Sequence, residues 1–124
     1  MNESQPAASG RQRNATGQLS MAISDKAALH ACYMPFIKDG AIFVPTTERF
    51  GLHHDVVLQL RLVEEGKKLV ISGRVVWIST GMGQRGTSPG VGLQFTGEHR
   101  LRVKQFIEEV LGDVLKQPPN NPAY

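Results

Sequence analysis

The fold is decided by residues 55–79, which read DVVLQLRLVEEGKKLVISGRVVWIS. In the first eight, apolar residues alternate with others in the period of two that a half-buried strand requires. The inward set is Val56, Leu58, Leu60 and Leu62. Glu65-Gly66-Lys67 then predicts a turn, and Leu69–Ser79 predicts the returning strand, in which Gly73 marks a bulge or a close backbone approach. The stretch therefore predicts an antiparallel hairpin.

Shorter strands are predicted before this hairpin. Leu19, Met21 and Ile23 alternate with small polar residues, and Asp25–Ala27 follows as a turn. The pattern of Ala28–Tyr33 fits either a strand or a short helix. Because Pro35 disfavours helical backbone at the residue before it, a strand is the preferred interpretation.

Turn residues and the spacing of apolar residues predict the next strand, the last strand and a C-terminal helix. Lys38-Asp39-Gly40 predicts a turn, and Ala41–Val44 a strand stopped by Pro45. After a glycine-rich loop at Gly81–Gly90, Val91–Phe95 alternates as a last strand. The period then becomes helical, with Glu108, Glu109 and Asp113 on the outer side. The apolar positions of that helix are Leu101, Val103, Phe106, Ile107, Val110, Leu111, Val114 and Leu115.

Length and composition indicate one domain. The 124 residues divide into a flexible arm at 1–18, a domain at 19–116 and a tail at 117–124. The formal charge of +3 is modest and the basic residues are scattered, which does not favour nucleic-acid binding. A single cysteine, the lack of an apolar leader and the lack of an eighteen-residue apolar stretch together predict a cytoplasmic protein.

Candidate chemical sites are weak. Gly81–Gly86 matches GxGxxG, but a strand follows where a dinucleotide site needs a helix. His30 and Cys32 would share a strand face, yet a structural zinc site needs four ligands, and His53 and His54 fit a polar turn. No arrangement of nucleophile and base is visible. We therefore expect no catalytic, cofactor-binding or metal-binding residues and no enzyme activity.

Three segments resemble the type IV pilus subgroup of the PilZ domain family. These are Tyr33-Met34-Pro35-Phe36 continuing through Lys38–Thr46, then Gly73–Ile78, and then Gly90–Phe95. The resemblance runs from about Leu19 to Leu115. It implies a mainly β fold, a six-stranded antiparallel PilZ-type β-barrel with one C-terminal α-helix, which agrees with the strands expected above.

Most PilZ domains are receptors for cyclic di-GMP that use an RxxxR pair and a D/N-x-S-x-x-G turn. No two arginines stand four residues apart in this chain. With Gly40 in the glycine position, Pro35 and Ile37 take the positions of two hydrogen-bonding residues. The resemblance therefore implies a non-enzymatic adaptor for type IV pilus biogenesis and twitching motility. Its expected partners are the pilus extension ATPase PilB and the EAL-domain protein FimX, with recruitment to the inner-membrane pilus machinery. The alternative is a cyclic di-GMP receptor with a non-standard site.

A partner-binding surface is expected at Tyr33, Met34, Pro35, Phe36 and Trp77. Aromatic anchors and methionine are enriched at the centres of protein interfaces. Tyr33 in particular is expected to be partly exposed and to act as an interface hot spot. The competing interpretation is that these side chains fill the interior of the barrel.

Overall fold

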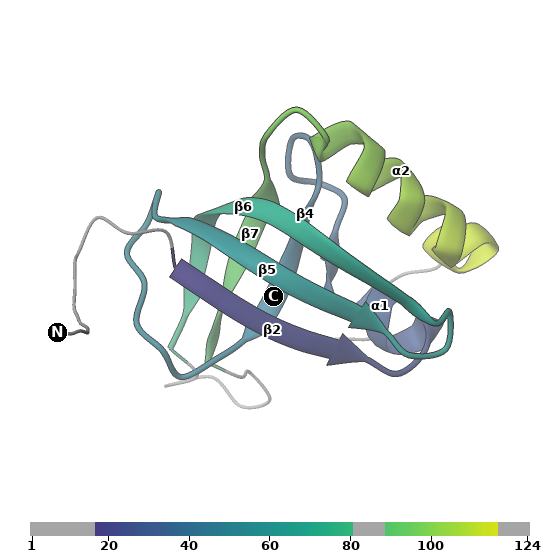
Figure 1. Ribbon diagram of the computed structural model, residues 1–124, viewed down its shortest axis with the longest axis horizontal. Helices are drawn as coiled ribbons and strands as arrows, with labels where there is room; N and C mark the ends of the chain where they lie inside the picture. The colour runs from purple at the N-terminus through teal and green to yellow at the C-terminus, as the bar shows by residue number, and fades with distance from the viewer. Residues whose placement is uncertain (1–16, 81–88, 117–124) are drawn as a thin grey trace, which may run out of the picture.

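The computed structural model describes residues 17–80 and 89–116 and shows a six-stranded sheet with a small helix and a C-terminal helix (Figure 1). Along the sheet the strand order is β2-β5-β6-β7-β4-β3. The strands are β2 (Gly17–Ile23), β3 (Tyr33–Met34), β4 (Ala41–Pro45), β5 (Asp55–Leu62), β6 (Lys67–Ser79) and β7 (Gly90–Phe95). The mainly β fold with a C-terminal helix is thus confirmed. The expected arm, the tail and the Gly81–Gly86 match lie wholly or mostly outside the described residues, and β2 begins at Gly17.

The hairpin of β5 and β6 forms as expected. Its pairing runs from Asp55 opposite Arg74 to Leu62 opposite Lys67, and the four inward residues of β5 are buried. The register irregularity in β6 lies between Val75 and Trp77. Gly73 instead marks a close approach, because a Cβ atom there would stand 3.1 Å from the Cβ of Leu93.

The expectation that all strands are antiparallel is wrong for β2. This strand pairs with β5 in parallel, from Gly17 opposite Val56 to Ile23 opposite Leu62. Parallel neighbours need a long crossover, and the segment that contains the small helix, β3 and β4 supplies it. No pairing between the described parts of β2 and β3 closes the sheet, so it is an open sheet rather than a closed barrel.

The strand expected at Ala28–Tyr33 is wrong, because these residues lie mostly in the helix α1 (Lys26–Cys32). Asp25 caps the helix, with its Oδ1 accepting a hydrogen bond from the backbone N–H of Ala28 at 2.9 Å. The cap and the alanine-rich sequence outweigh the influence of Pro35. That proline stands beyond the end of the helix, where it is well tolerated.

The helix α2 (Arg100–Leu111) packs beside the sheet and contacts β6 and β7 (Figure 1). It ends at Gly112, whose φ of 53° belongs to the left-handed region, and a 3₁₀ turn, η1 (Gly112–Lys116), follows. Ile107 and Leu111 are buried against the main core, whereas Leu101, expected on the apolar face, is exposed. The helix therefore covers the core with its central and C-terminal turns.

Candidate protein-interaction surface

The short strand β3 points its two side chains to opposite faces of the sheet. Tyr33 pairs with Ile42, and both belong to the main core. Met34 pairs with Ala41, and these two form a second, smaller cluster with Phe43, against which Ile37 packs. We call Met34, Ile37, Ala41 and Phe43 the Met34 cluster. Strand alternation thus separates the YMPF segment into an inward and an outward part.

The Met34 cluster lies over two glycines of β7. A Cβ atom at Gly92 would stand 2.9 Å from the Cβ of Trp77 and 3.3 Å from the Sδ of Met34. At Gly90 it would stand 2.6 Å from the Cζ of Phe43. The absence of side chains at these positions lets the large groups lie close to the strand. The structure therefore brings Met34 and Trp77 together, although 43 positions separate them.

Exposure differs sharply among the expected surface residues. Phe36 is 69% exposed and Trp77 41% exposed, and Pro35 is also exposed. Met34 is fully buried, so it can support an interface but cannot be reached by a partner in this conformation. Sequence reasoning missed Ile78, which is exposed beside Trp77. The register irregularity after Val75 breaks the alternation of inward and outward side chains in β6, and nothing in the sequence marks the position of this irregularity.

The expected exposure of Tyr33 is wrong. Its side chain is 1% exposed, and its hydroxyl donates a hydrogen bond to Oε2 of Glu108 at 2.6 Å. The same oxygen accepts a hydrogen bond from Nζ of Lys104 at 2.7 Å. Burial, and then the bond to Glu108, raises the pKa of Tyr33, while the bonds from Lys104 and Tyr33 lower the pKa of Glu108. Glu108, assigned to the outer side of the helix by its spacing, thus anchors the YMPF segment.

Helix α2 and β7 also hold the turn that follows. Nε of Arg100 contacts Oδ2 of Asp39 at 3.1 Å, and the amide of Gln94 donates to the carbonyl of Lys38 at 2.9 Å. Gly40 has a φ of 82°, and a Cβ atom there would stand 3.2 Å from the ring of Phe95. These contacts fix the turn that presents Pro35 and Phe36, which favours a preorganised surface.

Comparison with protein families decides the identity of this fold. The PilZ domain family matches residues 11–111, a range that includes all six strands and α2. The chain belongs to the PilZ domain family. PilZ domains bind cyclic di-GMP or act as adaptors. No curated protein matches the chain.

The turn of this PilZ domain contains the positions that the resemblance assigns to the second cyclic di-GMP motif. Pro35, assigned to the Asp or Asn position, is exposed, and Ile37, assigned to the Ser position, packs against Met34, Ala41 and Phe43. With this assignment, the position of the serine hydroxyl holds an apolar group that is part of a hydrophobic contact. The described part of the turn offers a ligand no side-chain hydrogen-bonding group at either position.

The histidine and cysteine side chains of this PilZ domain do not assemble a site. His30 and Cys32 lie two apart on a helix rather than on one strand face, so they point in different directions. The Cys32 thiol donates to the carbonyl of Ala28, and burial raises its pKa to about 11, so it stays protonated at neutral pH. His53 and His54 lie in a turn, as expected. Among residues 17–80 and 89–116, no three His, Cys, Asp or Glu side chains gather as a metal site.

No helix in the described ranges is both long and apolar enough to cross a membrane.

Proposed function

We propose that this PilZ domain is a non-enzymatic adaptor for type IV pilus biogenesis and twitching motility that acts through protein contacts rather than by binding cyclic di-GMP. The packing of Ile37 against Met34, Ala41 and Phe43 carries the proposal, because Ile37 places an apolar group in the serine position that the resemblance assigns to it. The sequence adds that no RxxxR pair exists anywhere in the chain. We propose that the domain acts in the cytoplasm, at the inner-membrane pilus machinery.

The energetic argument concerns the two phosphates of cyclic di-GMP. Charge-assisted hydrogen bonds contribute about 1.5–3 kcal/mol each, and paired arginines supply several of them. Loss of the arginine pair and of the polar turn removes the principal contacts to the ligand. Micromolar affinity is then not expected, since each 1.4 kcal/mol changes affinity about tenfold.

The proposed partner surface consists of Pro35, Phe36 and Trp77, with Met34 buried behind them. Phe36 and Trp77 supply large apolar areas that a partner could cover, and aromatic groups of this kind dominate binding energy in interfaces. Tyr33 contributes by holding the segment through Glu108 rather than by touching a partner. PilB and FimX are the partners that the resemblance to pilus-type PilZ proteins suggests.

Isothermal titration with cyclic di-GMP tests the first half of the proposal. We expect no measurable heat of binding at micromolar concentrations. A saturable, stoichiometric isotherm would instead support the alternative function, a cyclic di-GMP receptor with a non-standard site.

Affinity measurements with purified PilB and FimX test the second half. Phe36→Ala and Trp77→Ala each remove an exposed aromatic group and should weaken binding of at least one partner by about 2 kcal/mol, roughly 30-fold. Leu52→Ala is the matched control, because Leu52 is 56% exposed and lies outside the proposed surface. Wild-type affinity of both aromatic variants for both partners would exclude this surface.

A further inference from the structure

Among residues 17–80 and 89–116, strand β2 forms an open edge of the sheet. Its seven residues, GQLSMAI, carry no charge and no proline. Its backbone pairs with β5, and the bond from the N–H of Val63 to the carbonyl of Ile23 extends the same ladder. No other described residue hydrogen bonds to this strand. Edge strands are usually protected from added strands by charges, prolines or a covering element, and β2 has no charge or proline to do so.

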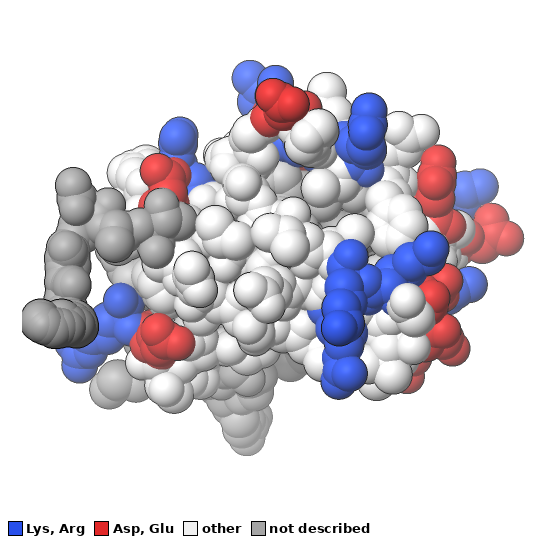
Figure 2. All heavy atoms as spheres, viewed as in Figure 1, with Lys and Arg blue, Asp and Glu red and all other residues white. Residues whose placement is uncertain are grey.

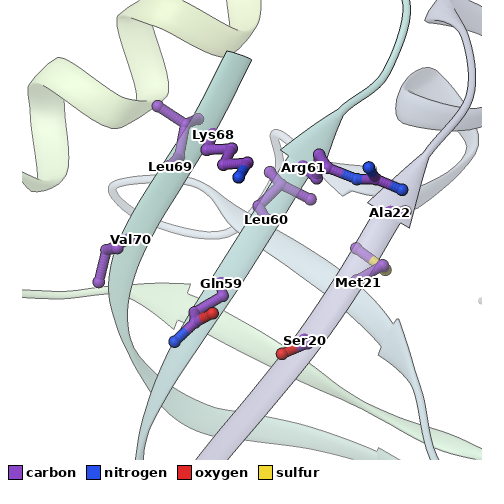
Figure 3. A pocket seen from close by; sticks show the side chains of 9 residues that line it. All are labelled: Ser20, Met21, Ala22, Gln59, Leu60, Arg61, Lys68, Leu69 and Val70. Atoms are coloured by element: carbon purple, nitrogen blue, oxygen red, sulfur yellow. The ribbon is translucent and has the colours of Figure 1, made fainter. Parts of the chain in front are cut away.

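Beside this edge, the outer face of β2, β5 and β6 is hollowed (Figure 3). The hollow has a volume of about 410 Å³. It is lined by Ser20, Met21, Ala22, Gln59, Leu60, Arg61, Lys68, Leu69 and Val70. Its charged side chains are both cations, and the lining includes no carboxylate. Figure 2 shows Lys and Arg side chains gathered over this part of the sheet, next to a broad uncharged area.

The two cations stand opposite each other on neighbouring strands. Arg61 of β5 pairs directly with Lys68 of β6 in the ladder. Like charges in such positions destabilise a sheet. Among the described residues, neither cation forms a salt bridge, in contrast to Arg74, which contacts Asp55 at 3.6 Å further along the same hairpin. The arrangement leaves two adjacent cations without a salt-bridge partner among the described residues.

The position of Arg61 connects this charge with the open edge. Ala22 of β2 is its ladder partner, and the Arg61 side chain extends across β2 over this small residue (Figure 3). A strand added to β2 would place an outward side chain about 5 Å from Ala22. A carboxylate there would lie within reach of the guanidinium, which binds carboxylates in a bidentate manner.

We propose that the open edge of β2 binds an extended acidic segment of a partner protein by strand addition. An Asp or Glu of that segment would lie opposite Ala22 and pair with Arg61, with Lys68 adding to the attraction. Two positions along the segment, a hydrogen-bonding side chain would face Ser20 and Gln59. Backbone hydrogen bonds between the segment and β2 would supply affinity, and the carboxylate would fix the register of the added strand. A second copy of the chain fits less well, because β2 itself contains no acidic residue.

This site is separate from the proposed partner surface of Pro35, Phe36 and Trp77. Val70 and Trp77, which border the two sites, are seven residues apart on β6, or about 23 Å along an extended strand. Failure of one proposal therefore leaves the other standing.

The test uses the full chain and a fluorescein-labelled nine-residue peptide of alternating Thr and Val with Glu at its centre, and a counterpart with Gln in that place. Fluorescence anisotropy should show about tenfold tighter binding of the Glu peptide. Arg61→Gln should remove this preference, whereas Arg102→Gln, which removes one exposed cation from α2, should leave it intact. Hydrogen exchange of the β2 amides should slow when the Glu peptide binds.

Ala22→Glu provides a second variant. The new carboxylate would neutralise Arg61 within the chain, so this variant should stay folded and lose the preference for the Glu peptide. No binding, equal binding of the two peptides, an unchanged preference in Arg61→Gln, or unprotected β2 amides would each overturn the proposal. It would also fail if light scattering showed a dimer whose β2 amides are already protected, or if inorganic phosphate displaced the peptide at comparable concentration.

Discussion

Replacing Tyr33 with Phe isolates the hydrogen bond that joins the YMPF segment to α2. The ring stays in the main core, and the change removes only the hydroxyl that donates to Glu108 at 2.6 Å. A hydrogen bond to a charged group contributes about 1.5–3 kcal/mol. Glu108 keeps its bond to Lys104 and is 30% exposed, so water can replace part of the lost contact. We therefore expect a loss near the lower limit, about 1.5 kcal/mol.

Urea denaturation at pH 7, followed by tryptophan fluorescence, measures this loss. For a domain of this size it corresponds to a decrease in Tm of about 6 °C. Tyr33→Ala, which also empties a core position, should cost about 3–5 kcal/mol. Phe36→Ala is the control, because its side chain is 69% exposed and its removal should change the free energy of unfolding by less than about 0.5 kcal/mol.

A double-mutant cycle with Glu108→Gln identifies the interaction itself. The two substitutions should be non-additive by about 1 kcal/mol if the hydroxyl and the carboxylate form the bond described. Strict additivity, or a Tyr33→Phe variant as stable as the wild type, would refute the view that α2 holds the YMPF segment through this contact.

Four further outcomes are expected. Lowering the pH below the usual Glu pKa of 4.5 should shrink the stability difference between the wild type and Glu108→Gln. The lowered pKa of Glu108 stabilises the fold above pH 4.5, and this stabilisation is lost as the carboxylate protonates. Urea denaturation at several pH values measures the difference. Raising the pH above 10.0 should destabilise the wild type but affect Tyr33→Phe less, because the raised pKa of Tyr33 gives stability that is present below that value and is lost as the phenol ionises. Gly92→Ala should displace the only tryptophan and shift its emission, since the new Cβ would stand 2.9 Å from the Cβ of Trp77; Gly51→Ala, with open space around it, should leave the emission unchanged. Met34→Ala should cost about 2–5 kcal/mol in unfolding free energy, because the side chain is fully buried, and an intact stability would show that the Met34 cluster does not support the fold.

The strands could be predicted wherever one face is buried and the other is solvated. The apolar residues of β5 alternate with more exposed ones for this reason, and the hairpin of β5 and β6 and its turn could be predicted from them. The α1 helix could not be predicted from the sequence, because it is only seven residues long and its capping residue Asp25 is equally typical of a turn. The parallel pairing of β2 leaves no mark on its sequence, since alternation is the same in either direction.

The exposure of the candidate surface residues could be predicted in part. Phe36 and Trp77 are exposed, whereas Tyr33 and Met34 are buried on opposite faces of the sheet, and partner binding at this surface stays a prediction. The partner of the Tyr33 hydroxyl could not be found from the sequence, because Glu108 is 75 residues away and its helical spacing indicates a solvated face. Such distant contacts depend on how α2 packs, which the local pattern does not specify.

The parallel pairing of β2 also has a consequence for synthesis. Gly17 emerges from the ribosome about 40 residues before Val56, its partner in β5. At about 5–20 residues per second, an uncharged strand would wait roughly 2–8 seconds before that partner is made. The hairpin of β5 and β6 is local and can form quickly, whereas β2 must close a long loop to join it. We expect β2 to join the sheet only after this hairpin has formed, so that its uncharged edge stays exposed to chaperones and to aggregation during that interval.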